Sequence, residues 1–155
     1  MGKLPNNIIG ITGEYLVCAE LGKRGILGLL TPKNNPLFDI VATSLDGKRS
    51  VAIQVKTMSN DNNQGWKLGK DICIKQNNEN LFVVLVNMKK SENDFFIYQY
   101  DVLSERVKEV YNKYISTPKK DGSPRKDVDF RWFDFKEFTP DDYARINNWG
   151  ILGFN

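Results

Sequence analysis

Apolar residues recur at helical spacing near the start of the chain. In the stretch TGEYLVCAELGKRG, which begins at Thr12, one helical face carries Glu14, Val17, Cys18 and Leu21. Thr12 suits the N-cap position, and glycines at 22 and 25 are available to end the helix. An acid at the head of an apolar stripe is unusual, because an unpaired buried carboxylate costs several kcal/mol. The plainer alternative is that Glu14 lies in the first turn, where it suits the helix dipole.

A strand pattern with a period of two follows the helix. Residues 26–32 predict a short buried strand, and residues 37–44 and 50–58 predict two strands joined at Asp46-Gly47, a strong hairpin signal. A two-residue loop makes the numbers of paired residues sum to 93 and places Asp39 opposite Gln54, whereas a four-residue loop gives 95 and places Asp39 opposite Lys56. In either register these three polar side chains share one face.

The second half of the chain predicts further alternation of strands and helices. Residues 67–80 have no firm periodicity and are compatible with a short or irregular helix, whereas LFVVLVNM (81–88) is typical of a central strand covered on both faces. DFFIYQY (94–100) predicts another strand. Asp101 can cap a helix over 102–115 whose core stripe consists of Leu103, Val107, Val110, Tyr111 and Tyr114.

The last forty residues predict an exposed segment and a final edge of the fold. Residues 117–127 (TPKKDGSPRKD) combine prolines, a glycine and basic residues, which predicts a mobile, exposed loop. FRWFDFKEF (130–138) predicts a late edge strand, and Thr139-Pro140 opens a short helix. The spacing of the late aromatics favours a role in the core and at the sheet edge; they are Phe130, Trp132, Phe133, Phe135 and Trp149.

Length and composition restrict the class of protein. The 155 residues, 41% of them hydrophobic, fit a single domain spanning residues 1–155. No apolar run approaches the roughly 18 residues of a membrane span, and no secretory signal is visible, so we expect a cytoplasmic protein without membrane partners. Two cysteines, Cys18 and Cys73, are too few for a disulfide scaffold. The absence of histidine excludes Ser-His-Asp and Cys-His catalysis and His-ligated zinc.

The order of the predicted elements and four polar residues resembles the PD-(D/E)XK nuclease superfamily. The matching residues are Glu14 in TGEYLVCAEL, Asp39 in NPLFDIVA, and Gln54 and Lys56 in IQVKT. The Gln-x-Lys ending is similar to the Mrr-like branch. The resemblance covers mainly residues 11–58 and implies an α/β, restriction-endonuclease-like fold: a central mixed β-sheet flanked by helices, with an αβββαβ core.

The resemblance implies a catalytic site formed by Glu14, Asp39, Gln54 and Lys56. Phosphodiester hydrolysis needs a hard cation, and Mg²⁺ (or Mn²⁺) prefers oxygen ligands. Asp39 would be the principal ligand, joined by Glu14, the Gln54 amide oxygen and the backbone carbonyl of Val55. Lys56 would stabilise the developing charge or position the attacking water. Neutral Gln54 leaves two carboxylates instead of three, which lowers the expected metal affinity. The plainer alternative is a solvated polar stripe on an ordinary hairpin.

Basic residues beside aromatics are candidates for nucleic-acid contact, although such residues more often keep a surface soluble. The aromatic candidate is Trp66, and the basic candidates are Lys67, Lys70, Lys119, Lys120, Arg125 and Lys126. The sequence analysis therefore predicts a metal-dependent endonuclease that hydrolyses DNA, alone or as a homodimer. The alternatives are a catalytically inactive nuclease-fold module that binds nucleic acid or a protein partner, and an interaction module without nucleic-acid affinity. The net charge of +3 discriminates weakly between them.

Overall fold

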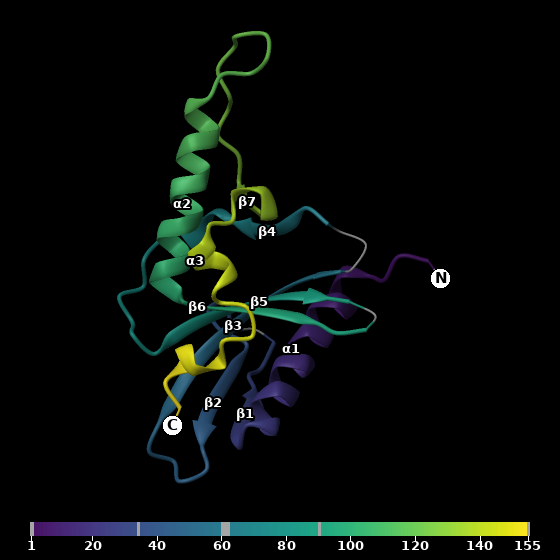
Figure 1. Cartoon of the computed structure of the whole chain (residues 1–155), viewed down its shortest axis with the longest axis vertical. Helices are drawn as coiled ribbons and strands as arrows, with labels where there is room; N and C mark the ends of the chain where they lie inside the picture. Colours follow the sequence, from purple (N-terminus) through teal and green to yellow (C-terminus); the bar gives the residue numbers. More distant parts are fainter. Residues whose placement is uncertain (1, 34, 60–62, 90, 155) are drawn as a thin grey trace.

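A computed structural model describes residues 2–33, 35–59, 63–89 and 91–154 (Figure 1). Its main elements are α1 (Asn6–Lys23), β1 (Ile26–Leu30), β2 (Ile40–Ser44), β3 (Ser50–Ser59), β4 (Gly65–Gly69), β5 (Leu81–Met88), β6 (Asp94–Gln99), α2 (Tyr100–Ser116), β7 (Phe130–Asp134) and α3 (Pro140–Tyr143). Short 3₁₀ turns cover Lys70–Cys73, Phe135–Glu137 and Trp149–Leu152. Among the helices of the described ranges, none has the length and apolarity needed to cross a bilayer.

A five-stranded sheet in the order β1-β2-β3-β5-β6 forms the centre of the fold. β3 and β5 are parallel, and the other neighbouring pairs are antiparallel. β4 and β7 form a separate antiparallel ribbon. The prediction of a central mixed sheet flanked by helices is thus confirmed. β5 lies in the interior because its first six residues, Leu81 to Val86, are apolar and can be covered on both faces.

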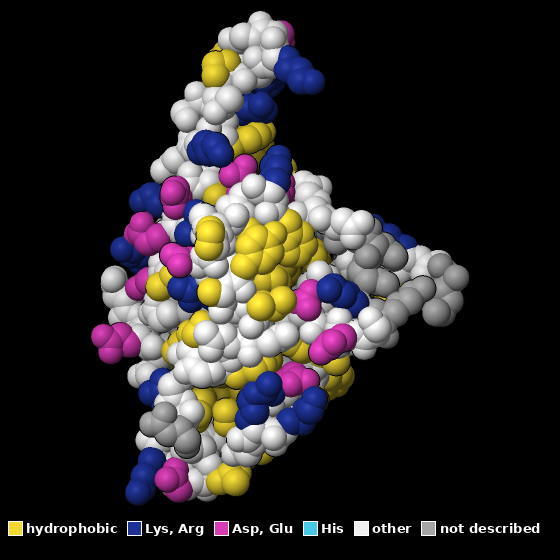
Figure 2. All heavy atoms as spheres, viewed as in Figure 1, with side chains coloured by type: hydrophobic (Ala, Val, Ile, Leu, Met, Phe, Trp, Pro, Cys, Tyr) yellow, Lys and Arg dark blue, Asp and Glu magenta, His cyan; other side chains and the backbone are white. Residues whose placement is uncertain are grey.

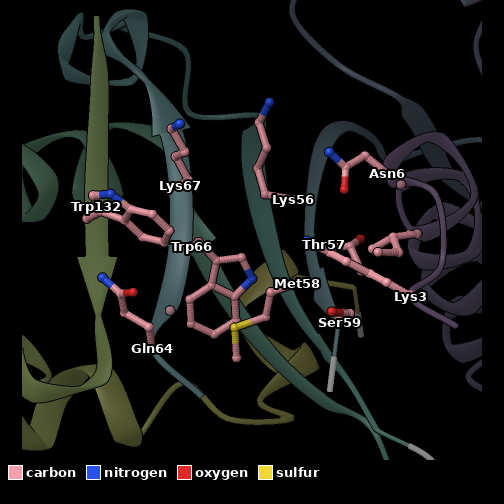
Figure 3. A pocket seen from close by; sticks show the side chains of 13 residues that line it. Lys3, Asn6, Lys56, Thr57, Met58, Ser59, Gln64, Trp66, Lys67 and Trp132 are labelled. Atoms are coloured by element: carbon pink, nitrogen blue, oxygen red, sulfur yellow. The ribbon is translucent and has the colours of Figure 1, made fainter. Parts of the chain in front are cut away.

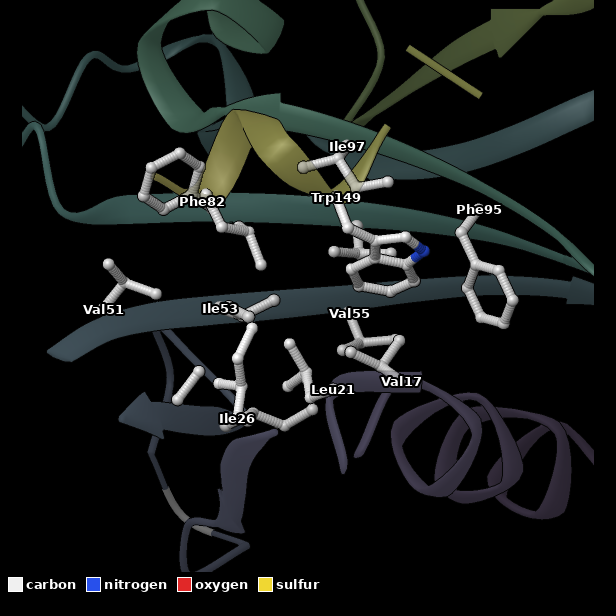
Figure 4. Packing of buried hydrophobic residues seen from close by; sticks show 14 of the residues in the cluster. Val17, Leu21, Ile26, Val51, Ile53, Val55, Phe82, Phe95, Ile97 and Trp149 are labelled. Carbon is white, nitrogen blue, oxygen red and sulfur yellow. The ribbon is translucent and has the colours of Figure 1, made fainter. Parts of the chain in front are cut away.

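Two apolar clusters lie on opposite faces of the sheet. On one face, Val17 and Leu21 of α1 pack against Val51, Ile53 and Val55 of β3 (Figure 4). On the other face, α2 and the β4–β7 ribbon bury a second set of side chains, which includes Trp66, Leu68, Leu103, Tyr98 and Phe133. Alternation along β3 therefore assigns its odd-numbered residues 51, 53 and 55 to the α1 face.

The β2–β3 hairpin has the first of the two predicted registers. Ile40 pairs with Ile53 and Thr43 pairs with Ser50, so that paired numbers sum to 93. In the connection, Gly47 has a positive φ of 71°, and the Asp46 carboxylate accepts the backbone N–H of Lys48 at 3.0 Å. Extending this register by one residue places Asp39 opposite Gln54.

The predicted start of the first helix is wrong. α1 begins at Asn6 with Pro5 at the N-cap, and Thr12 lies inside it. The buried stripe of α1 begins upstream of the predicted boundary and consists of Ile9, Gly13, Val17 and Leu21. Packing of this stripe therefore extends the helix, although the glycines inside it weaken it locally.

Three further predictions need correction. Of residues 67–80, only Lys70–Cys73 form a short 3₁₀ helix, because 65–69 pair with β7, more than sixty residues later in the chain. The side chain of Gln99, not that of Asp101, caps α2 by accepting a hydrogen bond from the Val102 N–H. The Asp101 carboxylate instead accepts hydrogen bonds from the backbone N–H groups of Gln76 (2.7 Å) and Asn77 (3.0 Å). Tyr114, expected in the core stripe of α2, is 46% exposed.

The end of α2 and the segment that follows it stand away from the sheet (Figure 1). We call residues 110–129 the arm. Its tip is exposed, as expected, and a turn closes it: the Lys119 N–H donates to the Ser123 carbonyl and the Gly122 N–H donates to the Lys119 carbonyl, each at 2.9 Å. β7 then returns to the body of the protein, and a capping box at Thr139 begins α3, as expected.

Candidate active site at the open edge of β3

Asp39 lies where β3 loses its antiparallel neighbour. β2 pairs with β3 only as far as Ile53, whereas β3 continues to Ser59. Asp39 Oδ2 accepts the backbone N–H of Val55 at 2.7 Å. The backbone of Asp39 is held as well, because its N–H donates to the Ile53 carbonyl and its C=O accepts from the Thr31 N–H, each at 2.9 Å. The carboxylate is therefore fixed at the open edge of β3.

The same edge presents the Val55 carbonyl. In a strand, the N–H and C=O of one residue point toward the same neighbouring strand. Because the Val55 N–H points to Asp39, the Val55 C=O also points to that side. The remaining Asp39 oxygen, Oδ1, accepts no hydrogen bond from the described residues. The edge thus offers a free carboxylate oxygen together with a backbone carbonyl oxygen.

Gln54 and Lys56 project from the face of β3 opposite α1. Both side chains are partly buried, and they alternate with Val55, which packs under α1. Within the described ranges, neither side chain forms an ion pair or a hydrogen bond. The shared face predicted for Asp39, Gln54 and Lys56 agrees with this register, although the Asp39 carboxylate turns toward the strand edge to reach the Val55 N–H.

Glu14 approaches from the opposite face, on α1. It is partly buried at the head of the stripe that continues with Val17 and Leu21. Burial raises the pKa of the Glu14 carboxyl, and the negative charge of Asp39 raises it further, while Lys33 opposes both effects. The tertiary structure therefore brings Glu14 and Asp39 within electrostatic range of one another, with an exposed lysine nearby that the sequence analysis missed.

The donor set at this edge fits a hard divalent cation. The Asp39 carboxylate and the Val55 carbonyl are oxygens of the kind that Mg²⁺ and Mn²⁺ favour, and the Glu14 carboxylate lies within electrostatic range of Asp39. A cation between Glu14 and Asp39 would also relieve the repulsion that raises the pKa of Glu14. Across the residues that the structure describes, no group of three or more acidic, histidine or cysteine side chains is placed to hold a metal.

Lys56 also lines a hollow that continues along the edge of β3 (Figure 3). We call it the β3 groove. It has a volume of about 800 Å³. The last residues of β3 form its floor, and the first turns of α1 and the β4–β7 ribbon form its two walls. Its lining consists of Lys3, Asn6, Ile9, Gly10, Lys56, Thr57, Met58, Ser59, Gln64, Gly65, Trp66, Lys67 and Trp132.

The charge of the β3 groove is positive. Three lysines line it, Lys3, Lys56 and Lys67, and none of its described lining residues is acidic. None of the three lysines forms an ion pair within the described chain. The first turn of α1 adds the positive end of a helix dipole, with no acid and no side-chain cap to offset it.

Trp66, predicted to contact nucleic acid, is buried in the structure. Its side chain is 2% exposed, packs edge-on against Phe96, and donates its indole N–H to the Val86 carbonyl at 3.1 Å. Trp132, on the paired strand, is partly exposed and lines the β3 groove instead. A period-two pattern shows that Trp66 and Lys67 face opposite sides, but it does not show which side is covered.

The other predicted cations lie away from Lys56. Lys119, Lys120, Arg125 and Lys126 are on the arm, where Figure 2 shows basic side chains along its outer end. Arg125 stacks over the Tyr114 ring at 4.5 Å and donates to the Thr117 carbonyl. Lys70 pairs with Asp129 at 3.4 Å. The structure therefore brings Lys67 alone, of the predicted cations, to the groove that contains Lys56.

Comparisons with solved structures find an endonuclease. The chain is similar to the bacterial homing endonuclease I-Ssp6803I, with 15% sequence identity, a TM-score of 0.53, and coverage of 96% of this chain and 93% of that chain. It is also similar to Hjc, a Holliday junction resolvase of Archaeoglobus fulgidus, with 16% identity, a TM-score of 0.43, and coverage of 80% and 89%. No protein-family model and no curated protein matches the chain. The first likeness shows a shared fold.

Proposed function

We propose that this protein is a divalent-metal-dependent endonuclease that hydrolyses DNA phosphodiester bonds at the open edge of β3. One observation carries the proposal: the Asp39 carboxylate is fixed on the Val55 N–H, at the strand edge that also presents the Val55 carbonyl and adjoins Lys56. The likeness of the fold to that of a homing endonuclease supports it. In the reaction, a water oxygen bonds to phosphorus, one P–O ester bond breaks, and a proton passes to the leaving oxygen.

Each residue of the site has a specific role in this proposal. Asp39 and Glu14 would hold the cation, and the oxygens of Gln54 and Val55 would complete the protein's share of the ligands. A bound Mg²⁺ or Mn²⁺ supplies Lewis-acid stabilisation of the phosphate oxygens and lowers the pKa of water. Lys56 places a positive charge beside the phosphate, where charge accumulates in the transition state.

Cleavage assays test the proposal. The purified chain is incubated with Mg²⁺ or Mn²⁺ and with supercoiled, linear and single-stranded DNA, and products are resolved on gels. We expect nicking or cutting that EDTA abolishes and that Asp39→Asn removes. Binding of Mn²⁺ without cleavage of any of these substrates would contradict the proposed reaction.

The neutral side chain of Gln54 favours a second candidate, a nuclease-fold module that binds nucleic acid without cutting it. Two carboxylates hold a divalent cation less tightly than three. Calorimetry separates the two candidates, because the module would bind DNA and show no heat of Mn²⁺ binding, whereas the enzyme would show both. The salt dependence of DNA binding does not separate them, since both rely on phosphate contacts.

A further inference from the structure

The outer face of the β4–β7 ribbon carries aromatic and basic side chains together. Lys67 pairs with Trp132, and Gly69 pairs with Phe130, so Lys67, Phe130 and Trp132 share one face. The Lys67 ammonium lies 4.3 Å from the centroid of the Phe130 ring. Gly69 adds no side chain beside that ring. The opposite face of the ribbon is buried in the core through Trp66, Leu68 and Phe133.

Trp132 lies between two hollows. It lines the β3 groove on one side and, on the other, a hollow of about 510 Å³ between the arm and β7. Figure 3 shows its indole beside Lys67, across the groove from Lys56 and the start of α1. A partly exposed indole between two open spaces differs from Trp66, whose ring is enclosed by Phe96, Phe135 and Phe138.

Of the two hollows beside Trp132, the β3 groove has no acid among its described lining residues, whereas the hollow beside the arm has two, Asp134 and Glu137. In the hollow beside the arm, the lining acids neutralise cations: Lys113 pairs with Glu137 at 3.3 Å and Lys136 pairs with Asp134 at 3.7 Å. Lys3, Lys56 and Lys67 have no such partners within the described chain. Phosphate groups would therefore bind more favourably in the β3 groove than in the hollow beside the arm.

We propose that the β3 groove binds a nucleic-acid strand that contains at least one unpaired nucleotide. Trp132 stacks on the unpaired base, Lys67 and Lys3 bind phosphates on the two walls, and Lys56 contacts the phosphate between them. Aromatic side chains stack on any exposed base, whereas in a duplex the neighbouring bases cover both faces, and extruding a base costs unstacking energy. This inference rests on the proposed function and names its substrate class as single-stranded or incompletely paired nucleic acid.

The test compares single-stranded and duplex binding without cleavage. Fluorescence anisotropy in EDTA measures the affinity of a labelled thymidine oligonucleotide of about 12 nucleotides and of a duplex of the same length. We expect Trp132→Ala to weaken single-strand binding about fivefold to a hundredfold, with duplex binding changed less than about twofold. Trp132→Phe keeps a stacking ring and should retain most of the affinity, which excludes misfolding as the cause of the loss.

The lysines are tested by salt dependence. Lys67→Gln and Lys3→Gln should each lower the slope of log affinity against log salt by about 0.7 for the single strand. Matched controls are Tyr15→Ala, which removes an exposed aromatic of α1 outside the groove, and Lys108→Gln, which removes an exposed charge of α2; neither should change binding.

Two outcomes would overturn the inference. One is an affinity for the single strand that Trp132→Ala leaves unchanged. The other is an equal loss of affinity for the duplex and the single strand in Trp132→Ala. Because binding is measured in EDTA, these results are independent of catalysis. A wild-type protein that prefers the single strand through Trp132 but never cleaves with Mg²⁺ or Mn²⁺ contradicts the proposed reaction and leaves the binding inference standing.

Discussion

Asp39 Oδ2 accepts the backbone N–H of Val55 at 2.7 Å, across the point where β2 ceases to pair with β3. No backbone carbonyl of β2 is available to the Val55 N–H at this point, and the Asp39 carboxylate takes its place as the acceptor. The carboxylate therefore stabilises the strand edge as well as offering a ligand. The two roles can be separated experimentally, because an asparagine keeps an oxygen acceptor but loses the charge.

We expect Asp39→Asn to abolish the binding of Mn²⁺ while changing the free energy of unfolding by less than about 1 kcal/mol. Asp39→Ala, which also removes the acceptor, should lose an additional 1 to 3 kcal/mol or so because the Val55 N–H is left without a partner. Titration calorimetry and chemical denaturation measure the two quantities. Unchanged Mn²⁺ affinity in Asp39→Asn would show that this carboxylate is not a ligand.

Replacing Lys56 tests its part in stabilising the transition state. Lys56→Ala should lower the cleavage rate about 100-fold to 1000-fold. DNA affinity should fall by less than about tenfold, because the loss removes one phosphate contact among several. Lys108→Ala, on the exposed face of α2, is the control. Equal cleavage by Lys56→Ala and the wild type would exclude a catalytic role.

Gln54→Glu restores a third carboxylate to the site. We expect the affinity for Mn²⁺ to rise about tenfold, since affinity increases with the number of charged ligands. Without metal, the added charge should destabilise the protein through repulsion with Asp39 and Glu14. Saturating Mn²⁺ should then raise the melting temperature of Gln54→Glu more than that of the wild type. A smaller rise in the variant would place Gln54 outside the ligand set.

Gly13 sets the distance between α1 and β3. A Cβ atom added there would lie 1.8 Å from Thr57 Oγ1 and 2.9 Å from Thr57 Cβ. Gly13→Ala should therefore displace the helix that carries Glu14 and destabilise the fold by about 1 to 3 kcal/mol. Gly22→Ala, on the same helix with no atom within 4 Å of an added Cβ, should instead stabilise the fold by up to about 1 kcal/mol. Equal denaturation midpoints for the two variants would contradict this close approach.

Asp142 gives the fold a dependence on pH. Burial alone would raise the pKa of Asp142, but hydrogen bonds from Arg106 (2.7 Å), the Thr139 N–H and the Tyr98 hydroxyl outweigh it and hold the pKa below its usual value. The ionised carboxylate therefore stabilises the fold above the unfolded-state pKa of about 3.9, and this stabilisation is lost as the pH falls through the lower folded-state pKa.

Asp142→Asn should accordingly lose about 3 to 5 kcal/mol of unfolding free energy at neutral pH, because it removes the buried partner of Arg106 and leaves it only the exposed carboxylate of Glu109. The difference from the wild type should shrink as the pH falls below about 4. Urea denaturation across this pH range measures it. Asp141→Asn, at the exposed neighbouring position, is the control and should show no such trend. A constant difference at all pH values would argue against the ion pair.

Local patterns in the chain determined most of the elements. The continuous apolar run of β5, the alternation of β2 and β3 and the Asp46-Gly47 turn predict these strands and allow the observed register, because each signal depends on residues close in sequence. The same reasoning selected Asp39, Gln54 and Lys56 as a polar cluster, since strand geometry alone brings them together. Their metal and catalytic roles remain predictions.

Tertiary packing decided what local patterns leave open. The pairing of 65–69 with 130–134 made a strand that was not predicted, buried Trp66 and left Trp132 partly exposed. No local signal encodes a partner more than sixty residues away. Burial of Ile9 extended α1 beyond its predicted start, and the close approach of Gly13 to Thr57 brought Glu14 into electrostatic range of Asp39. The chain by itself specified the strands of the five-stranded sheet and its polar cluster, whereas the groove and its charge exist only because distant segments cover one another's apolar faces.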